Sequence, residues 1–218
     1  MSSPTESIQV TEVSATGTNS IDALLGGIKW GDALGLGASL SYSFPYLNGV
    51  SATWADTYWT STENEPNYAA SGFTEIQQAS ALAALQRWGS AANLTFSKTT
   101  ETATDVGDIR FAFTFTPTIR EYWGYAYFPA AGEAQGGDIW VNPDYSIDYQ
   151  YNSWDFGSYN YLALLHELGH ALGLKHPFDA GAAEDQAILP PETESRQYTV
   201  MSYTAHPHST FLDVTETN

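Results

Sequence analysis

The chain of 218 residues contains no cysteine. Disulfide bonds, thiolate zinc sites and catalytic thiols are therefore excluded, and so is a propeptide that blocks a metal with a cysteine. Basic residues are also scarce, because seven Lys and Arg stand against twenty-five Asp and Glu and give a formal net charge of −18. So acidic a surface repels phosphate backbones and anionic membranes, and neither nucleic acid nor a membrane is an expected partner.

The chain also lacks a run of apolar residues long enough to span a membrane, and its N-terminus lacks the basic and apolar regions of a cleavable signal peptide. Residues 1–20 are rich in Ser and Thr, and we expect a flexible tail or a short propeptide there. Glu6, Glu12 and Asp22 are the carboxylates in this part of the chain that a propeptide could place on a metal. Residues 21–218 are expected to form one domain that acts as a monomer.

Aromatic residues are abundant, with ten Phe, fourteen Tyr and seven Trp, and they can fill a sizeable core. The first long helix is predicted over residues 74–88, because Thr74 and Gln77 make a capping-box pair at its start. One apolar stripe of this helix is expected to face the core: Ile76, Ala79, Leu82 and Leu85.

Strands are predicted where apolar residues alternate or cluster between turn residues. Five segments qualify: residues 40–45, 94–97, 108–115, 122–129 and 136–142. Together with the predicted helices, this order indicates an α+β fold, a mixed sheet with helices packed on it.

Three of the five histidines lie close together, in the segment HELGHALGLKHP that begins at His166. A helix is predicted over residues 158–173, so His166 and His170 lie on one face and can share a metal. Gly173 is predicted to end this helix in a left-handed conformation, which lets the chain turn back and bring His176 to the same ion. Three neutral imidazoles with an open fourth position are typical of a catalytic zinc site.

Glu167 follows the first histidine and is rotated by about 100° around the helix axis. This position keeps its carboxylate off the metal but near a water bound to it, where it can act as a general base. The pattern predicts hydrolysis by zinc-activated water. Two other readings stay open: an ordinary solvated glutamate, and a zinc site without catalytic activity.

Two motifs resemble those of a known family. The histidine segment is similar to the extended zinc motif of the metzincin peptidases, and Pro177 after the third histidine is similar to their serralysin branch. Further along, residues 198–203, YTVMSY, resemble the Met-turn of that family. The resemblance implies a metzincin-like fold, a twisted mixed sheet packed with a long helix from the N-terminal half and a zinc-binding helix. It also implies that Met201 lies beneath the zinc, and that Tyr203 ligates or approaches the metal and then stabilises the oxyanion.

The resemblance implies a secreted zinc endopeptidase that hydrolyses peptide bonds in proteins with Glu167 as the general base. Its substrates are polypeptides bound in extended form along a sheet edge at residues 125–128, and a small protein inhibitor is a further implied partner. Export is implied to use no N-terminal signal, and the family's own export signal has no counterpart in this chain.

The sequence also departs from the serralysin pattern. It ends at Asn218 without glycine- and aspartate-rich calcium-binding repeats, so we expect a catalytic domain that is C-terminally incomplete relative to the family, with no calcium site located. The alternative function is a catalytically silent binding module on a metzincin scaffold, or an inactive truncated fragment. Asp138 either binds calcium or caps a turn. His206 and His208 have no spacing that joins them to the other three, so we expect them on the surface.

Overall fold

The computed structural model describes residues 9–47, 51–68, 70–147, 153–180, 187–206 and 208. The strands are β1 (Val10–Glu12), β2 (Ile28–Trp30), β3 (Ala38–Ser43), β4 (Ser71–Gly72), β5 (Leu94–Lys98), β6 (Ile109–Phe113), β7 (Gly124–Ala126) and β8 (Asp138–Val141). The helices are α1 (Asn19–Asp22), α2 (Asp56–Thr60), α3 (Glu75–Ala91), α4 (Pro143–Ile147) and α5 (Tyr159–Ala171), with 3-10 turns η2 (Glu65–Asn67) and η3 (Thr118–Glu121). All five predicted strands are present, although β7 is shorter than predicted.

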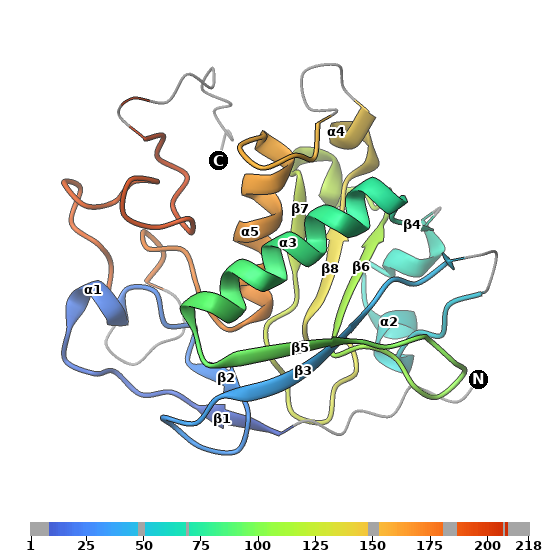
Figure 1. Ribbon diagram of the computed structural model, residues 1–218, viewed down its shortest axis with the longest axis horizontal. Helices are drawn as coiled ribbons and strands as arrows, with labels where there is room; N and C mark the ends of the chain where they lie inside the picture. Colours follow the sequence, from blue (N-terminus) through green and yellow to red (C-terminus); the bar gives the residue numbers. More distant parts are fainter. Residues whose placement is uncertain are drawn as a thin grey trace.

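Six of these strands form one mixed sheet in the order β5-β3-β6-β8-β7, with β4 added alongside β6. Strands β5, β3, β6 and β8 run parallel, whereas β7 runs antiparallel to β8 at one edge. In Figure 1 the long helix α3 crosses in front of the sheet, and α5 lies next to it on the same side. The predicted α+β architecture is confirmed.

Helix α3 is confirmed together with its capping box, in which Thr74 accepts from the Gln77 amide and the Gln77 side chain accepts from Thr74. Its predicted buried face is wrong, since Ile76 is 69% exposed and Leu85 is the one large apolar residue of the predicted stripe that is buried. The buried face instead consists mostly of small or polar residues: Gln77, Ser80, Ala81, Ala84 and Leu85. Small side chains let the helix lie close to a core already filled by large aromatic residues from the strands.

The centre of the sheet, strands β6 and β8, is buried on both faces. Ile109, Phe111 and Phe113 of β6 pack in the core beneath α3 and α5, as the alternation predicts. Arg110 and Ala112 point to the opposite face, and they are buried as well. We call this opposite surface the far face. Its apolar residues come from three segments and the sheet itself: Trp54, Ala55, Tyr58, Ala112, Ile119, Ala134 and Trp140.

The N-terminal segment packs against the rest of the domain from residue 9 onward. Strand β1 pairs antiparallel with β2, and the Trp30 indole donates a 2.8 Å hydrogen bond to the Ala171 carbonyl at the end of α5. The Asp22 carboxylate accepts from the backbone amides of Thr16 and Gly17, so it is used within this segment. Residues 1–8, which include Glu6, lie outside the described part, and the tail or propeptide role of residues 1–20 stays a prediction.

Within the described residues, no helix is long and apolar enough to cross a bilayer.

Candidate metal centre and substrate groove

Helix α5 positions the first two histidines. Ser158 caps its N-terminus by accepting from the Tyr161 amide, and Gly173 follows its last turn with φ of +104°. A side chain is excluded at residue 173, because a Cβ there would lie 2.2 Å from the Ile28 carbonyl oxygen. The predicted helix and its glycine end are therefore confirmed, and the chain turns back directly after α5.

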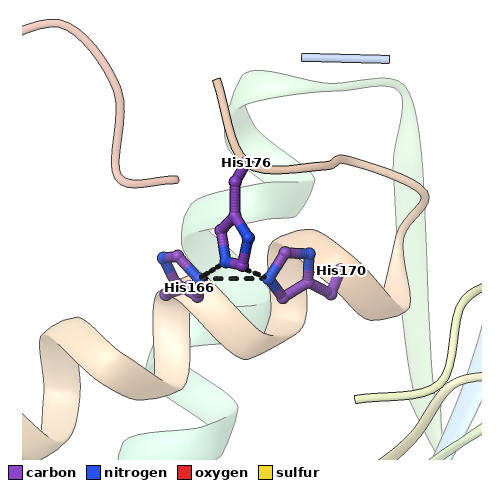
Figure 2. Close-up of side chains that lie close together, drawn as sticks. All are labelled: His166, His170 and His176. Carbon is purple, nitrogen blue, oxygen red and sulfur yellow. Dashed lines mark hydrogen bonds between the residues drawn. The ribbon is translucent and has the colours of Figure 1, made fainter. Parts of the chain in front are cut away.

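The structure brings His166, His170 and His176 together. Their three Nε2 atoms are 3.0–3.1 Å apart. Figure 2 shows the three rings pointing toward one another. Within the described residues, these three form the group of His, Cys, Asp or Glu side chains that could hold a metal ion. A triangle of this size allows one ion to lie at the usual zinc–nitrogen distance of about 2.0–2.1 Å from each corner. The donor set therefore fits zinc.

The other ring nitrogens fix the tautomers of two histidines. Nδ1 of His166 lies 2.9 Å from the Val200 carbonyl oxygen, and Nδ1 of His170 lies 2.7 Å from that of Leu174. Because a carbonyl can only accept, both Nδ1 atoms carry the proton and both Nε2 atoms are bare lone pairs. The 3.1 Å approach of Nε2 of His166 to Nε2 of His170 therefore brings two acceptors together, as two ligands of one metal ion do.

Burial keeps the three imidazoles neutral. It lowers the pKa of His166, to which the neighbouring His170 adds, and it lowers the pKa of His170 as well. Burial also lowers the pKa of His176 to about 4, again with a contribution from His170. Neutral imidazole is the form that binds a metal, so near neutral pH the site needs no proton loss before it takes an ion.

Glu167 and Tyr203 lie beside the histidines. Both side chains line a cavity of about 30 Å³ that His166 and Arg196 also border, and Glu167 is 7% exposed. The Tyr203 ring stacks on His166 at a centroid distance of 5.3 Å and lies 4.6 Å from the His176 ring. The two residues predicted to act in catalysis are therefore both next to the histidine triad.

Met201 lies beneath α5, fully buried. Gly169 makes this contact possible, since a Cβ at that position would lie 2.2 Å from the Met201 sulfur. The methionine side chain thus packs on the helix backbone between His166 and His170, and it offers a substrate no strong hydrogen-bonding group.

A larger groove of about 520 Å³ runs from the histidines along β7. It is bordered by His170, His176 and Tyr203 and by residues 124–128, which include the predicted substrate-binding edge, residues 125–128. Among the described strands β7 pairs with β8 alone, so its outer side is an edge onto which another strand can add. The Phe128 ring borders the groove, and its centroid lies 5.6 Å from that of the His170 ring.

Sequence reasoning missed Lys175, which holds the loop between Gly173 and His176. Its side chain is 4% exposed, and the ammonium donates to the carbonyls of Ala23, Asp179 and Ala187 at 2.6–2.9 Å. All three acceptors are backbone carbonyls, which every residue carries, so no side-chain pattern predicts these bonds. The same holds for the carbonyls that orient His166 and His170.

Three further predicted residues lie away from the triad. His206 and His208 are exposed, as expected. Asp138 lies at the start of β8 with 1% exposure, accepts from the Tyr58 hydroxyl at 2.7 Å and faces Arg110 at 3.8 Å. It therefore belongs to a buried polar network of the far face, and its predicted turn-capping role is wrong because the sheet register buries it.

Comparison with known proteins agrees with this geometry. A peptidase family model described as Matrixin matches residues 53–199, which include the predicted general base and all three histidines. The chain belongs to the matrixin family. Within it, the chain carries a serralysin-type metzincin catalytic domain, as its similarity to three serralysins shows.

The serralysins come from several bacteria. Serralysin of Photorhabdus luminescens is 34% identical over 61% of this chain, serralysin C of Dickeya chrysanthemi 31% over 81%, and serralysin of Proteus mirabilis 32% over 78%. The matched part is 27%, 35% and 34% of those proteins, so this matrixin-family chain spans about a third of their length.

Proposed function

We propose that this domain is a zinc-dependent endopeptidase that hydrolyses peptide bonds in polypeptides bound along β7. One observation carries the proposal. Three Nε2 atoms converge at 3.0–3.1 Å, and Glu167 and Tyr203 border the cavity next to them. The three histidines supply the metal ligands, and Glu167 and Tyr203 supply two polar groups beside the edge strand β7.

His166, His170 and His176 hold the metal through Nε2. When bound, zinc supplies Lewis-acid chemistry, since it polarises a carbonyl oxygen and lowers the pKa of water to about 7. The Val200 and Leu174 carbonyls keep two of the rings in the tautomer that exposes Nε2, which raises the basicity of both ligands.

Glu167 is the general base. It comes one residue after His166 on α5, and it borders both the small cavity and the groove along β7. There it takes a proton from the attacking water and passes it to the leaving amine, and a general base of this kind contributes about 10²–10⁴-fold to the rate.

Tyr203 supplies the oxyanion donor. Its ring lies against His166 and His176, so its phenol can ligate the metal at rest and donate a hydrogen bond to the negatively charged oxygen during attack. Met201 takes no part in the chemistry and supports the helix from below.

The substrate adds to the outer side of β7 as a further strand. Backbone hydrogen bonds then fix an extended polypeptide of almost any sequence next to the metal, which suits an endopeptidase with protein substrates. We place this activity outside the cell, with a small protein inhibitor as a further partner of the same groove. Calcium has no proposed site in this chain.

Metal removal tests the proposal. Zinc content and hydrolysis of casein are measured before treatment with a chelator, after it, and after zinc is restored. We expect one zinc per chain, loss of hydrolysis with the metal, and recovery with zinc. Hydrolysis that continues in the metal-free protein would overturn the proposal.

The same experiment separates the alternative, a binding module without activity. A chain that holds one zinc and binds unfolded casein, yet leaves it intact over hours, would favour that alternative.

A further inference from the structure

The groove along β7 extends beyond the metal site to the far face of the sheet. Glu63 and Thr118 border it together with Tyr125 and Tyr127. Tyr125 is in register with Trp140 of β8, so these tyrosines project toward the far face, whereas Ala126 is in register with Ile139 of the core beneath the helices. The groove therefore has two walls, one on each face of the edge strand.

Glu63 is a carboxylate without an ion-pair partner among the described residues. Its Oε1 accepts a 2.9 Å hydrogen bond from the Thr118 hydroxyl, while its Oε2 is buried without a hydrogen-bond partner among the described residues. None of the described residues forms an ion pair with it. A partly buried anion that lacks a cation is costly, and a ligand with a positive charge would remove that cost.

None of the described lysines and arginines forms an ion pair with Glu63. Lys175 is the one lysine or arginine among the described residues that borders the groove, and its ammonium already donates to three backbone carbonyls. Arg110 is committed to Glu101 by a 2.8 Å ion pair behind the sheet. The charge at Glu63 is thus left for a partner molecule.

Tyr125 and Tyr127 stand beside Glu63 as fixed, uncharged rings. Both hydroxyls donate to Oε1 of the buried Glu65, at 2.7 and 2.5 Å, which holds the rings in an edge-to-face pair. Burial raises the pKa of both phenols, and the Glu65 carboxylate raises it further, so they stay protonated. Fixed tyrosine rings next to a carboxylate form a surface that favours a lysine or arginine side chain.

The direction of a bound strand places alternate side chains on this wall. Successive residues of an extended peptide point to opposite faces of the sheet to which it adds. Every second side chain of a peptide on β7 therefore points toward the tyrosines and Glu63, while the others point toward α5.

We propose that Glu63, Tyr125 and Tyr127 form a subsite for a basic side chain of the polypeptide substrate. The subsite rests on the proposed function, because it requires that the substrate lies along β7. It makes the enzyme favour extended segments with a lysine or arginine at one fixed distance from the scissile bond.

Peptide hydrolysis tests this subsite. Quenched-fluorescence peptides carry arginine, lysine, citrulline or norleucine in turn at each position around the scissile bond, and kcat and KM are measured with the zinc-loaded chain. At one position we expect arginine over citrulline and lysine over norleucine by about tenfold in kcat/KM, mostly through KM.

Glu63→Gln keeps the acceptor for Thr118 and removes the charge, so it should lower kcat/KM for the arginine and lysine peptides to the values of their citrulline and norleucine counterparts. Glu75→Gln is the matched control, because Glu75 is exposed at the start of α3 and does not border the groove. An unchanged preference in Glu63→Gln, or an equal loss on all peptides, would overturn the subsite.

A binding measurement keeps this result separate from the peptidase activity. Fluorescence polarisation of the arginine and citrulline peptides on zinc-loaded Glu167→Ala chains, with and without Glu63→Gln, reports the subsite without turnover. Charge-dependent binding that needs Glu63, in a chain whose parent does not cleave, supports the subsite and contradicts the proposed function. Cleavage without any charge preference supports the proposed function and contradicts the subsite.

Discussion

The metal centre and the far face of the sheet bury their polar groups in different ways. At the metal centre, two of the three ligands lie four residues apart on one helix, and the third follows six residues later. On the far face, Tyr58, Arg110 and Asp138 meet from segments far apart in the chain. Local spacing defines the first cluster and sheet register defines the second, so sequence patterns reveal only the first.

The two regions also respond to pH in opposite directions. Burial lowers the pKa of the imidazoles, whereas burial raises the pKa of Asp138 to about 8 despite the nearby Arg110. Both shifts favour the uncharged form. The metal centre is therefore prepared to accept a cation, and the far face is a network that supports the sheet from behind.

The largest effect is expected from His170→Ala. Loss of one ligand should lower hydrolysis by about 10³-fold or more and weaken zinc binding, because two imidazoles hold the ion poorly. Zinc titration and peptide hydrolysis check this. His206→Ala removes an exposed histidine outside the triad and should change neither; full activity in His170→Ala would contradict the proposed ligand set.

Arg110→Met tests the far face. This arginine is 1% exposed and paired with Glu101, so its removal leaves the largely buried Glu101 carboxylate without a cation and should lower the free energy of unfolding by about 3–5 kcal/mol. Urea unfolding measures the change. Arg87→Met, an exposed arginine over the Phe156 ring, should cost about 1 kcal/mol or less. Equal costs for the two variants would show that the network does not stabilise the fold.

Asp138→Asn tests the pH response of the far face. Because the folded-state pKa of about 8 exceeds the ordinary value of 3.8, the contribution of Asp138 is present below pH 4 and is lost as pH rises through 8. The stability of the parent relative to the variant should therefore fall by a few kcal/mol over this window. Urea unfolding of both proteins from pH 4 to pH 8 gives the difference, and a flat difference would refute the raised pKa.

The smallest of these effects is expected at the loop that carries His176. Lys175→Met removes three bonds to carbonyls and should weaken zinc binding by about 10–100-fold, as losses of outer supports of a metal site do. Lys29→Met is the matched control, because the Lys29 ammonium also donates to carbonyls, those of Trp30 and Ala33, and neither belongs to the metal loop. Zinc affinity is measured by competition with a chromogenic chelator, and equal losses in both variants would argue against a specific role.

Sequence patterns predicted helix α5, the glycine at its end and the three histidines, because each depends on spacing within a short segment. The buried face of α3 was not predictable, since small residues face a core filled from the strands. The hydrogen bond from the Lys175 ammonium to the Ala23 carbonyl joins segments that are distant in the chain. The bonds from the Tyr125 and Tyr127 hydroxyls to Glu65 do so too. Such contacts leave no pattern in the sequence.

The central claim is that Glu167 activates water at a zinc ion held by the triad. The most direct test compares the zinc-loaded parent and Glu167→Ala on one quenched-fluorescence peptide library, with zinc content measured in both. We expect cleavage by the parent, one zinc in each protein, and about 10²–10⁴-fold slower cleavage by the variant. A variant that keeps its zinc and still cleaves at the parent's rate would contradict the claim.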